Sequence, residues 1–191
     1  MLWTEKYRPF RISEIVGPNL LLYVNAGTGK TAAACAIATS ILGEEKETNF
    51  FEINASDDRK LETVRTRIKN IASTGKIGRV PFKIILLDEM DGMTKDAQNA
   101  LKRIMERYSN NCRFIITCNE RHRIIYPLQS RCANYLFKRL THSHMRLVLE
   151  GILTKEKIDT ITKEELDAFI GGLHGDIRRG ITELQASISS N

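Results

Sequence analysis

Hydrophobic residues along the first two thirds of the chain form short runs that alternate with segments of helical periodicity. The runs in "FKIILLDE" (82–89) and "CRFIITCN" (112–119) are nearly continuous, which is typical of strands buried on both faces. Strands that alternate with helices predict a parallel sheet covered by helices on both sides. The predicted strands are residues 20–24, 49–54, 82–89, 112–119 and 133–137, and the predicted helices between them are residues 31–42, 60–73 and 94–108.

The helix predicted over residues 94–108 has a clear start and a clear buried face. Thr94 stands just before it and can cap its first turn. Apolar residues recur at intervals of three and four, so we expect them to share one face against the core: Ala97, Leu101, Ile104, Met105 and Tyr108.

After Arg139 the pattern changes to helices only. Thr162 and Glu165 have the spacing of a capping box, and Gly171 can end the helix that this box begins. We therefore expect a domain boundary near residue 140. The segments "THSHMRLVLEGIL", "TKEELDAFIGG" and "GDIRRGITELQASIS" predict three helices beyond it.

Composition is that of an ordinary soluble globular protein, with 42% hydrophobic and 27% charged residues among 191. No apolar run has the length of a membrane span, and the first residues lack the apolar core of a signal peptide, so we expect no membrane association. A net charge of +6 suits a protein that binds a polyanion. The cysteines lack metal-ligand spacing and stand among apolar neighbours, which predicts buried thiols in a reducing compartment: Cys35, Cys112, Cys118 and Cys132.

The stretch "YVNAGTGKTAAACAIA" holds nearly all of a phosphate-binding loop, whose pattern is glycine, four residues, and then Gly-Lys-Ser/Thr. Gly29, Lys30 and Thr31 complete the pattern, but Val24 stands where the first glycine belongs. Valine suits that position if the backbone there is strand-like, and it is strained if the position needs a positive φ.

Polar residues follow the predicted strands and helices at points where they can meet a nucleotide. Asp88 and Glu89 end a buried strand, at the edge where open α/β sheets bind ligands. Asn119 ends the next strand, and Arg131 lies in a loop, where it acts only if another subunit's phosphate faces it. Arg178 begins the last helix, where either the nearby Asp176 or a bound phosphate balances its charge.

The order of these motifs resembles the small subunits of replication factor C, the clamp loader of eukaryotes and archaea, which are AAA+ ATPases. The motifs are "WTEKYRP", "GTGKT", "INASDDR", "LLDEMD", "AQNALKRIMERYSNNCRFIITCN", "PLQSRC" and "GDIRRGITELQ", and together they cover essentially the whole chain. The resemblance implies an α/β fold, in which a P-loop AAA+ domain with a five-stranded parallel sheet (1–139) precedes a small three-helix lid domain (140–191). Residues 1–191 are assigned in full to these two domains, so we expect no counterpart of the family's C-terminal collar among them.

The resemblance also implies a function and its partners. Members of the family bind ATP and Mg²⁺, work as pentamers with other clamp-loader subunits, and place a sliding clamp on primer–template DNA. They are intracellular, in the nucleus of eukaryotes and the cytoplasm of archaea. The residues that the resemblance places against adenine are Tyr7, Arg8, Pro9, Val16 and Gly17, and those of the phosphate loop are Asn25, Ala26, Gly27, Thr28, Gly29, Lys30 and Thr31.

Five further roles follow from the resemblance. Thr31 and Asp88 are expected to hold Mg²⁺, and Glu89 is expected to polarise the attacking water. Asn119 corresponds to sensor one, and Arg131 to an arginine finger that acts on a neighbour's ATP. Arg178 corresponds to sensor two of the lid, so that both Asn119 and Arg178 also contact nucleotide.

The stretch from Asp57 to Arg79 holds seven basic residues against three acidic ones, with few aromatics between them. This predicts contact with DNA phosphates rather than base stacking. We expect four residues to bind DNA: Arg65, Lys69, Lys76 and Arg103.

Two functions fit these residues. The first is an ATP-hydrolysing clamp-loader subunit, which five intact residues favour: Lys30, Thr31, Asp88, Glu89 and Asn119. The second is a subunit that binds nucleotide as a structural element and supplies Arg131 to its neighbour, which Val24 favours. A helicase-type AAA+ motor is disfavoured by the Ser-Arg-Cys sequence at residues 130–132.

Overall fold

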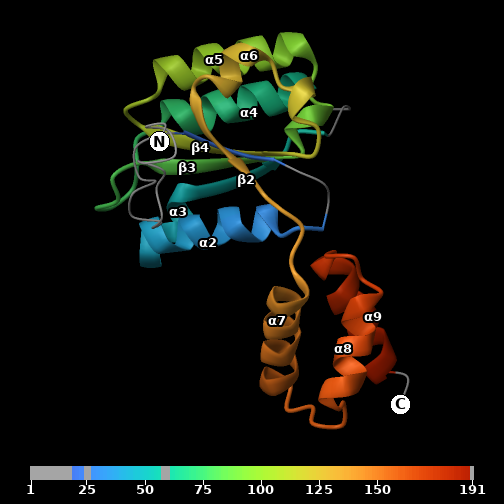
Figure 1. Ribbon diagram of the computed structural model, residues 1–191. Coiled ribbons are helices and arrows are strands. Elements are labelled where there is room, and N and C mark those ends of the chain that lie inside the picture. Colours follow the sequence, from blue (N-terminus) through green and yellow to red (C-terminus); the bar gives the residue numbers. More distant parts are fainter. Residues whose placement is uncertain (1–18, 24–26, 57–60, 190–191) are drawn as a thin grey trace, which may run out of the picture. The chain divides into compact units, whose positions relative to one another are not determined.

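The computed structural model describes residues 19–23, 27–56 and 61–189 (Figure 1). These residues divide into two compact units. One comprises the described residues of 1–23 together with 31–136, and the other comprises 27–30 together with 137–189.

The first unit is built on a five-stranded parallel sheet with the strand order β2-β3-β4-β1-β5. This confirms the predicted fold class. Because β4 lies between β1 and β3, the carboxyl ends of these three strands are adjacent. The strands are β1 (Asn19–Tyr23), β2 (Phe50–Asn54), β3 (Lys83–Asp88), β4 (Cys112–Cys118) and β5 (Cys132–Leu136).

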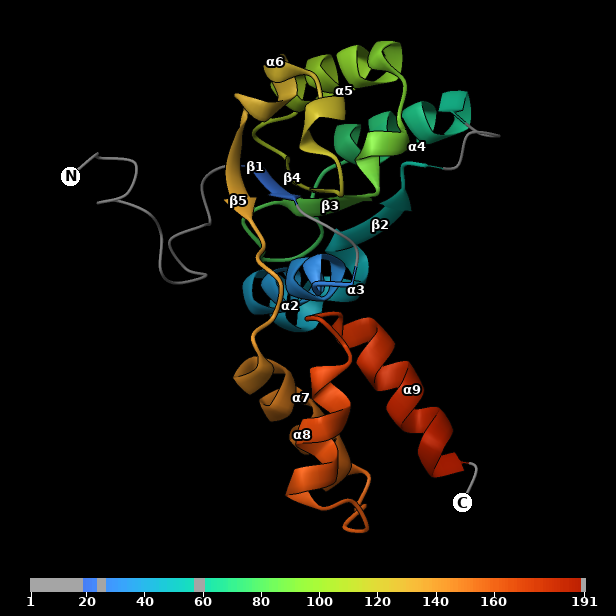
Figure 2. The same ribbon diagram turned by 45° about the vertical axis from the view of Figure 1, so that its right-hand side comes forward.

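Helices cover both faces of this sheet. Figures 1 and 2 show α4, α5 and α6 on one face and α2 with α3 on the other. The four-residue helices α3 and α6 were not predicted from the sequence, because a single turn is too short to show a helical periodicity of hydrophobic residues. The helices are α2 (Lys30–Leu42), α3 (Lys46–Asn49), α4 (Leu61–Ser73), α5 (Lys95–Arg107) and α6 (Tyr126–Gln129), with 3-10 turns η2 (Gly43–Glu45), η4 (Met90–Gly92) and η5 (Arg121–Arg123).

Successive side chains of the central strands point to opposite faces, so the sheet has a core on each side. Leu21, Leu87 and Ile116 pack in one cluster with residues of α4, α5 and α6. Leu20 and Leu86 are the strand neighbours of these residues and are also buried. Burial on both faces explains why the strands read as continuous apolar runs.

Helix α5 has the start and the face that its sequence predicts. The Thr94 hydroxyl accepts a hydrogen bond from the Ala97 N–H and caps the helix. The side chains of Leu101, Ile104 and Met105 are buried. Ala97 and Tyr108 are partly buried against the same cluster.

A buried glutamine fastens the start of α5 to the loop that leads to α6. The Gln98 side chain is 1% exposed. Its Nε2 donates to the carbonyls of Met93 and Arg123, both at 3.0 Å, and its Oε1 accepts from the Ile125 N–H at 2.8 Å. These bonds satisfy the amide and position the loop that begins just after β4.

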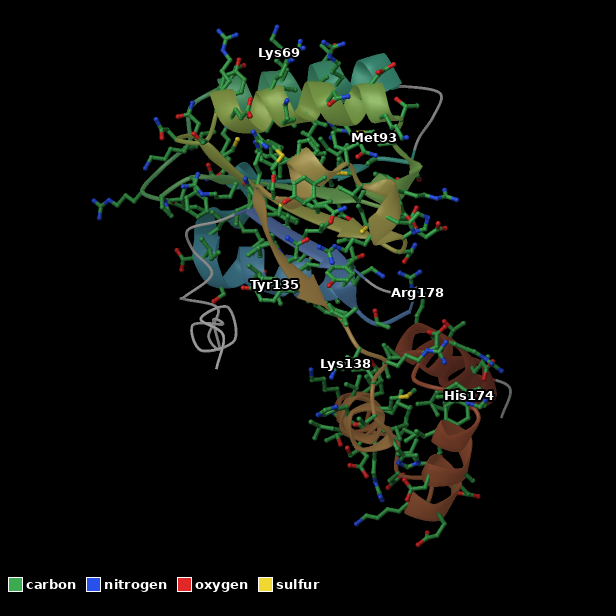
Figure 3. All side chains as sticks on the ribbon, turned by 45° about the horizontal axis from the view of Figure 1, so that its top comes forward. Lys69, Met93, Tyr135, Lys138, His174 and Arg178 are labelled. Atoms are coloured by element: carbon green, nitrogen blue, oxygen red, sulfur yellow. The ribbon has the colours of Figure 1, made fainter. Side chains whose placement is uncertain are left out.

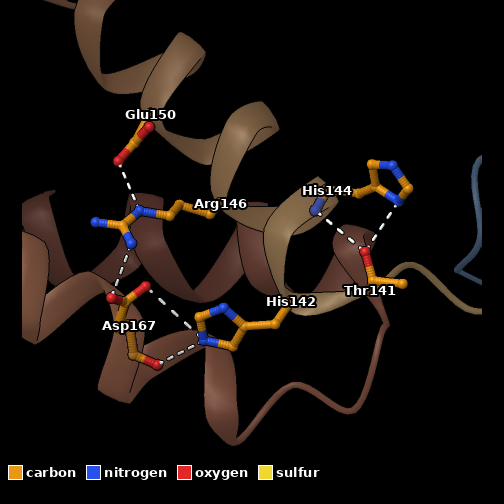
Figure 4. A network of polar contacts seen from close by, with 6 residues as sticks. All are labelled: Thr141, His142, His144, Arg146, Glu150 and Asp167. Atoms are coloured by element: carbon orange, nitrogen blue, oxygen red, sulfur yellow. Dashed lines mark hydrogen bonds and ion pairs between the residues drawn. The ribbon is translucent and has the colours of Figure 1, made fainter.

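The second unit contains three helices: α7 (His142–Lys155), α8 (Lys163–Gly171) and α9 (Ile177–Ser189). Thr162 and Glu165 form the predicted capping box, and Thr141 caps α7. Arg146 of α7 pairs with Glu150 and with Asp167 of α8 (Figure 4). The core of this unit is formed by Met145, Leu149, Leu153, Leu166, Ile170, Leu173, Ile177 and Leu184.

Among the described residues, no helix has both the length and the apolar character needed to cross a bilayer.

Candidate functional site

The phosphate-loop motif forms a turn that leads into α2. Gly27 and Gly29 have φ angles of +81° and +85°, a region that glycine enters without a steric penalty. Lys30 is the first residue of α2, and its side chain is 8% exposed. Backbone N–H groups at a helix start favour an anion, so the described part of this turn, residues 27–30, suits the phosphate predicted for it.

Part of the predicted nucleotide site lies outside the described residues. These residues are Tyr7, Arg8, Pro9, Val16 and Gly17 of the adenine group, and Val24, Asn25 and Ala26 of the loop.

Two threonine hydroxyls hold the carboxylate of Asp88 at the carboxyl end of β3. Thr31, the second residue of α2, donates from Oγ1 to Oδ1 at 3.1 Å and to Oδ2 at 3.2 Å. Thr117 of β4, which is 1% exposed, donates to Oδ1 as well. Carboxylate and hydroxyl oxygens are the ligands that Mg²⁺ prefers, so Thr31 and Asp88 fit the metal predicted for them.

Glu89 follows Asp88 in a left-handed backbone conformation, with φ 55° and ψ 44°. Such a conformation costs about 1 kcal/mol for a residue with a Cβ, and a specific contact offsets part of it. The Glu89 N–H donates to Thr117 Oγ1 at 3.1 Å. Thr117 therefore contacts both acidic residues at once and sets their relative position.

The Glu89 carboxylate is oriented by a serine from the neighbouring strand's end. Ser56 Oγ lies 2.7 Å from Asn54 Oδ1 and 3.2 Å from Glu89 Oε2, so its one proton is shared between these two acceptors. Asn54 also accepts from the Ser56 N–H at 2.8 Å, which fixes the turn after β2. Because β2 and β3 pair with Asn54 opposite Asp88, this turn lies beside the acidic pair.

Asp91 holds the backbone of the predicted sensor residue Asn119. Its Oδ2 accepts from the N–H groups of Asn119 at 3.3 Å and Glu120 at 3.2 Å. The other carboxylate oxygen, Oδ1, is buried without a hydrogen-bond partner among the described residues. Asp91 thus ties the turn after β3 to the turn after β4.

Asn119 is predicted to act in ATP hydrolysis, so we expect the change Asp91→Ala to displace it and to lower the kcat of that predicted reaction by about tenfold with ATP affinity unchanged, because small displacements of a positioned group cost rate. The change Asp91→Asn keeps an oxygen acceptor and should lose less. Steady-state hydrolysis in a complex with partner subunits measures this, with the exposed Asp159→Ala as the matched control. A wild-type kcat in Asp91→Ala would contradict the role.

Arg131 lies near the amino ends of the strands, whereas Asp88 lies at their carboxyl ends. It precedes β5, whose first residue pairs with Asn19 at the start of β1, whereas Asp88 ends β3. By the strand registers, Arg131 lies about four residues from the level of Asp88, which is about 13 Å along the strand direction. It also lies three strands away, which is about 14 Å across the sheet. This separation exceeds the reach of an arginine side chain.

The predicted DNA-binding residues belong to the first unit, three of them on α4 and α5 and one in the loop after α4. Lys69 projects from the outer face of α4 (Figure 3). Arg65 shares that helix, Lys76 follows it, and Arg103 lies on α5. All four side chains are exposed. Arg178 is an exposed residue in the first turn of α9 in the second unit (Figure 3).

Three of the four cysteines are buried, as predicted, but Cys35 of α2 is only half-buried. Burial raises the pKa of Cys112 to about 11 and that of Cys132 to about 12, so both remain thiols near neutral pH. Within the described part of the chain, no cluster of three or more His, Cys, Asp or Glu side chains is arranged to hold a metal ion.

Sequence reasoning missed Thr117, Ser56 and Asp91. All three stand inside motifs quoted for the resemblance, and Asp91 alone among them has an ionisable side chain, as the third acidic residue of "LLDEMD".

Comparison with known proteins gives a consistent result. Residues 20–140 match the model of the "ATPase family associated with various cellular activities (AAA)". The replication factor C small subunit of Methanosarcina barkeri is 45% identical over 204 residues, covering 97% of this chain and 61% of that protein. The protein of the same name from Archaeoglobus fulgidus is 45% identical over 203 residues, covering 97% and 63%.

The chain therefore spans about three fifths of the length of these curated relatives. Among solved structures, a single-residue variant of Thermotoga maritima RuvB superposes with a TM-score of 0.65 at 16% identity, covering 84% of this chain and 52% of that one. At this identity the structural likeness concerns the fold alone.

Proposed function

Because this chain belongs to the AAA family of ATPases, we propose that it is a clamp-loader subunit that binds and hydrolyses ATP. One observation carries the catalytic part of the proposal. Asp88 and Glu89 stand side by side at the carboxyl edge of the sheet, and a single buried hydroxyl of Thr117 contacts both.

The residues of the chain divide the work of binding and hydrolysis. Lys30 and the N–H groups of the loop bind phosphate oxygens, while Thr31 and Asp88 hold Mg²⁺. Bound MgATP supplies the γ-phosphoryl group and its charge neutralisation. Glu89 accepts the proton of the attacking water, and Ser56 orients its carboxylate for that transfer.

Three further residues have proposed roles in hydrolysis. Asn119 orients the water, held in place by the contacts of Asp91. Arg178 contacts the nucleotide from the lid, which we assign to residues 140–191 after a nucleotide-binding domain of residues 1–139. Arg131 acts in trans on a neighbouring subunit's ATP, and its distance from Asp88 along the sheet supports this assignment.

The relatives are named as subunits of replication factor C, and the proposed partners follow from that name. The proposed partners are the other clamp-loader subunits, a sliding clamp and primer–template DNA. The exposed residues of α4, α5 and the loop after α4 supply the DNA contacts: Arg65, Lys69, Lys76 and Arg103.

The alternative function is a subunit that binds nucleotide without hydrolysing it and still supplies Arg131. Val24 in place of the first loop glycine favours it. Hydrolysis at this chain's own site, measured with the partner subunits present, decides between the two.

We expect Lys30→Ala to weaken ATP binding by about ten- to hundredfold, because a charge-assisted hydrogen bond to phosphate contributes about 1.5–3 kcal/mol. Titration with a fluorescent ATP analogue measures the Kd. Lys155→Ala, an exposed lysine of α7, is the matched control. Absence of saturation by the unmodified chain at millimolar nucleotide, or equal affinity in Lys30→Ala, would overturn the proposed binding site.

A further inference from the structure

The guanidinium of Arg131 is held by contacts within its own chain. Nη1 donates to the Pro127 carbonyl of α6 at 2.6 Å, and Nη2 pairs with the carboxylate of Glu106 near the end of α5. The main chain of Arg131 is fixed as well: its N–H donates to Leu128, and its carbonyl accepts from Asn19 Nδ2 at 3.4 Å. Both the backbone and the side chain of Arg131 are therefore positioned.

We propose that Glu106 is a positioning residue for Arg131, which sets the plane of the guanidinium for a phosphate on a neighbouring subunit. The proposal rests on the trans role of Arg131 proposed above. Nothing in the residue pattern of α5 distinguishes Glu106 from other exposed acids, so this role emerges from the contact alone.

The two contacts leave the guanidinium able to act on a phosphate. Arginine carries five N–H donors in a planar fork, and the contacts with Pro127 and Glu106 use one donor on each Nη atom. Three donors remain for a ligand. Together with the covalent bond from Nε to the side chain, these two contacts fix three points of the planar group and so define its orientation. Without Glu106, the Pro127 carbonyl is the remaining contact of the guanidinium and holds the group less firmly.

The exposure of the Arg131–Glu106 pair fits a contact that serves the reaction rather than the stability of the fold. The side chains of Arg131 and Glu106 are 36% and 46% exposed, so the pair is open to an approaching ligand. An exposed ion pair contributes little to the stability of the fold. Its removal should therefore affect the rate at the neighbouring site far more than the folding of this chain.

The test compares single and double variants in a complex with partner subunits, with ATP as the substrate. We expect Glu106→Ala to lower kcat at the neighbouring site by about tenfold with KM for ATP nearly unchanged, because the arginine is displaced without being lost. Glu106→Gln keeps a neutral acceptor and should retain part of the rate. Glu150→Ala breaks an exposed ion pair of similar exposure in α7 and is the matched control.

The double variant Arg131→Ala with Glu106→Ala identifies the route of the effect. If Glu106 acts through Arg131, the second change costs nothing further once the arginine is absent. Equal, independent losses from the two changes would overturn the proposal. So would a faster rate in Glu106→Ala, since that result would mean that the carboxylate stores the arginine away from its target.

The outcomes also separate this proposal from the one it rests on. If Arg131→Ala leaves hydrolysis unchanged, the trans role of Arg131 fails. If Arg131→Ala lowers hydrolysis and neither Glu106 variant does, the positioning role alone fails. Thermal unfolding of each isolated chain shows whether the variants are folded, and Glu106→Gln serves if Glu106→Ala is not.

Discussion

Glu89→Gln should lower the rate of ATP hydrolysis by about 10²- to 10⁴-fold, while ATP binding is preserved. Glutamine has the shape of glutamate but lacks the negative charge that accepts a proton from water. The Ser56 hydroxyl can still donate to the amide oxygen, so the side chain should keep its place. The Thr117 contact is made with the backbone N–H of residue 89 and is unaffected by the change.

Single-turnover hydrolysis in the assembled complex measures this effect, and nucleotide titration measures binding in parallel. Glu52→Gln, an exposed carboxylate on β2, controls for the loss of one negative charge in the same unit. Unchanged turnover in Glu89→Gln would show that Glu89 does not activate the attacking water, and that the hydrolysis measured in the complex does not depend on this residue.

Arg131→Ala should reduce hydrolysis at the adjacent subunit by about 10³-fold or more, the effect of arginine fingers in other NTPases. Binding of ATP by the changed chain itself should remain nearly intact, because Arg131 lies at the far edge of its own sheet from Asp88. Nucleotide titration of the isolated chain and hydrolysis in the complex measure the two halves separately.

A mixing experiment tests the direction of action. Chains with Arg131→Ala lack the finger, and chains with Lys30→Ala lack the phosphate contact, so each supplies what the other lacks at one interface. Combined in a complex whose assembly is verified, they should recover part of the activity. Loss of ATP binding in isolated Arg131→Ala, or no recovery in the mixed complex, would show that Arg131 acts within its own chain.

Local sequence was sufficient for the elements of the fold because each carries its own signal. The strands are continuous apolar runs, and the caps at Thr94 and Thr162 are formed by residues three positions apart. The predicted fifth strand, 133–137, was one residue late, since Cys132 already pairs with Asn19. Such one-residue differences arise because the hydrogen bonds between strands, and not hydrophobicity, determine where a strand begins and ends.

The supporting residues of the candidate site lacked any such local signal. Thr117 reaches Asp88 across 29 residues, and Ser56 reaches Glu89 across 33, in both cases because parallel pairing brings strand ends together. A threonine inside an apolar strand reads as a β-former, and a serine after a strand reads as a turn residue. Only the strand order shows which polar residues share an edge.

The two hydroxyls on Asp88 have a consequence for ligand affinity. A free aspartate side chain samples several rotamers, and confining it to one costs conformational entropy of up to about 1 kcal/mol. In this protein Thr31 and Thr117 confine the carboxylate when the chain folds. That ordering cost is therefore part of the stability of the sheet, and a cation arriving at Asp88 meets a preorganised oxygen donor.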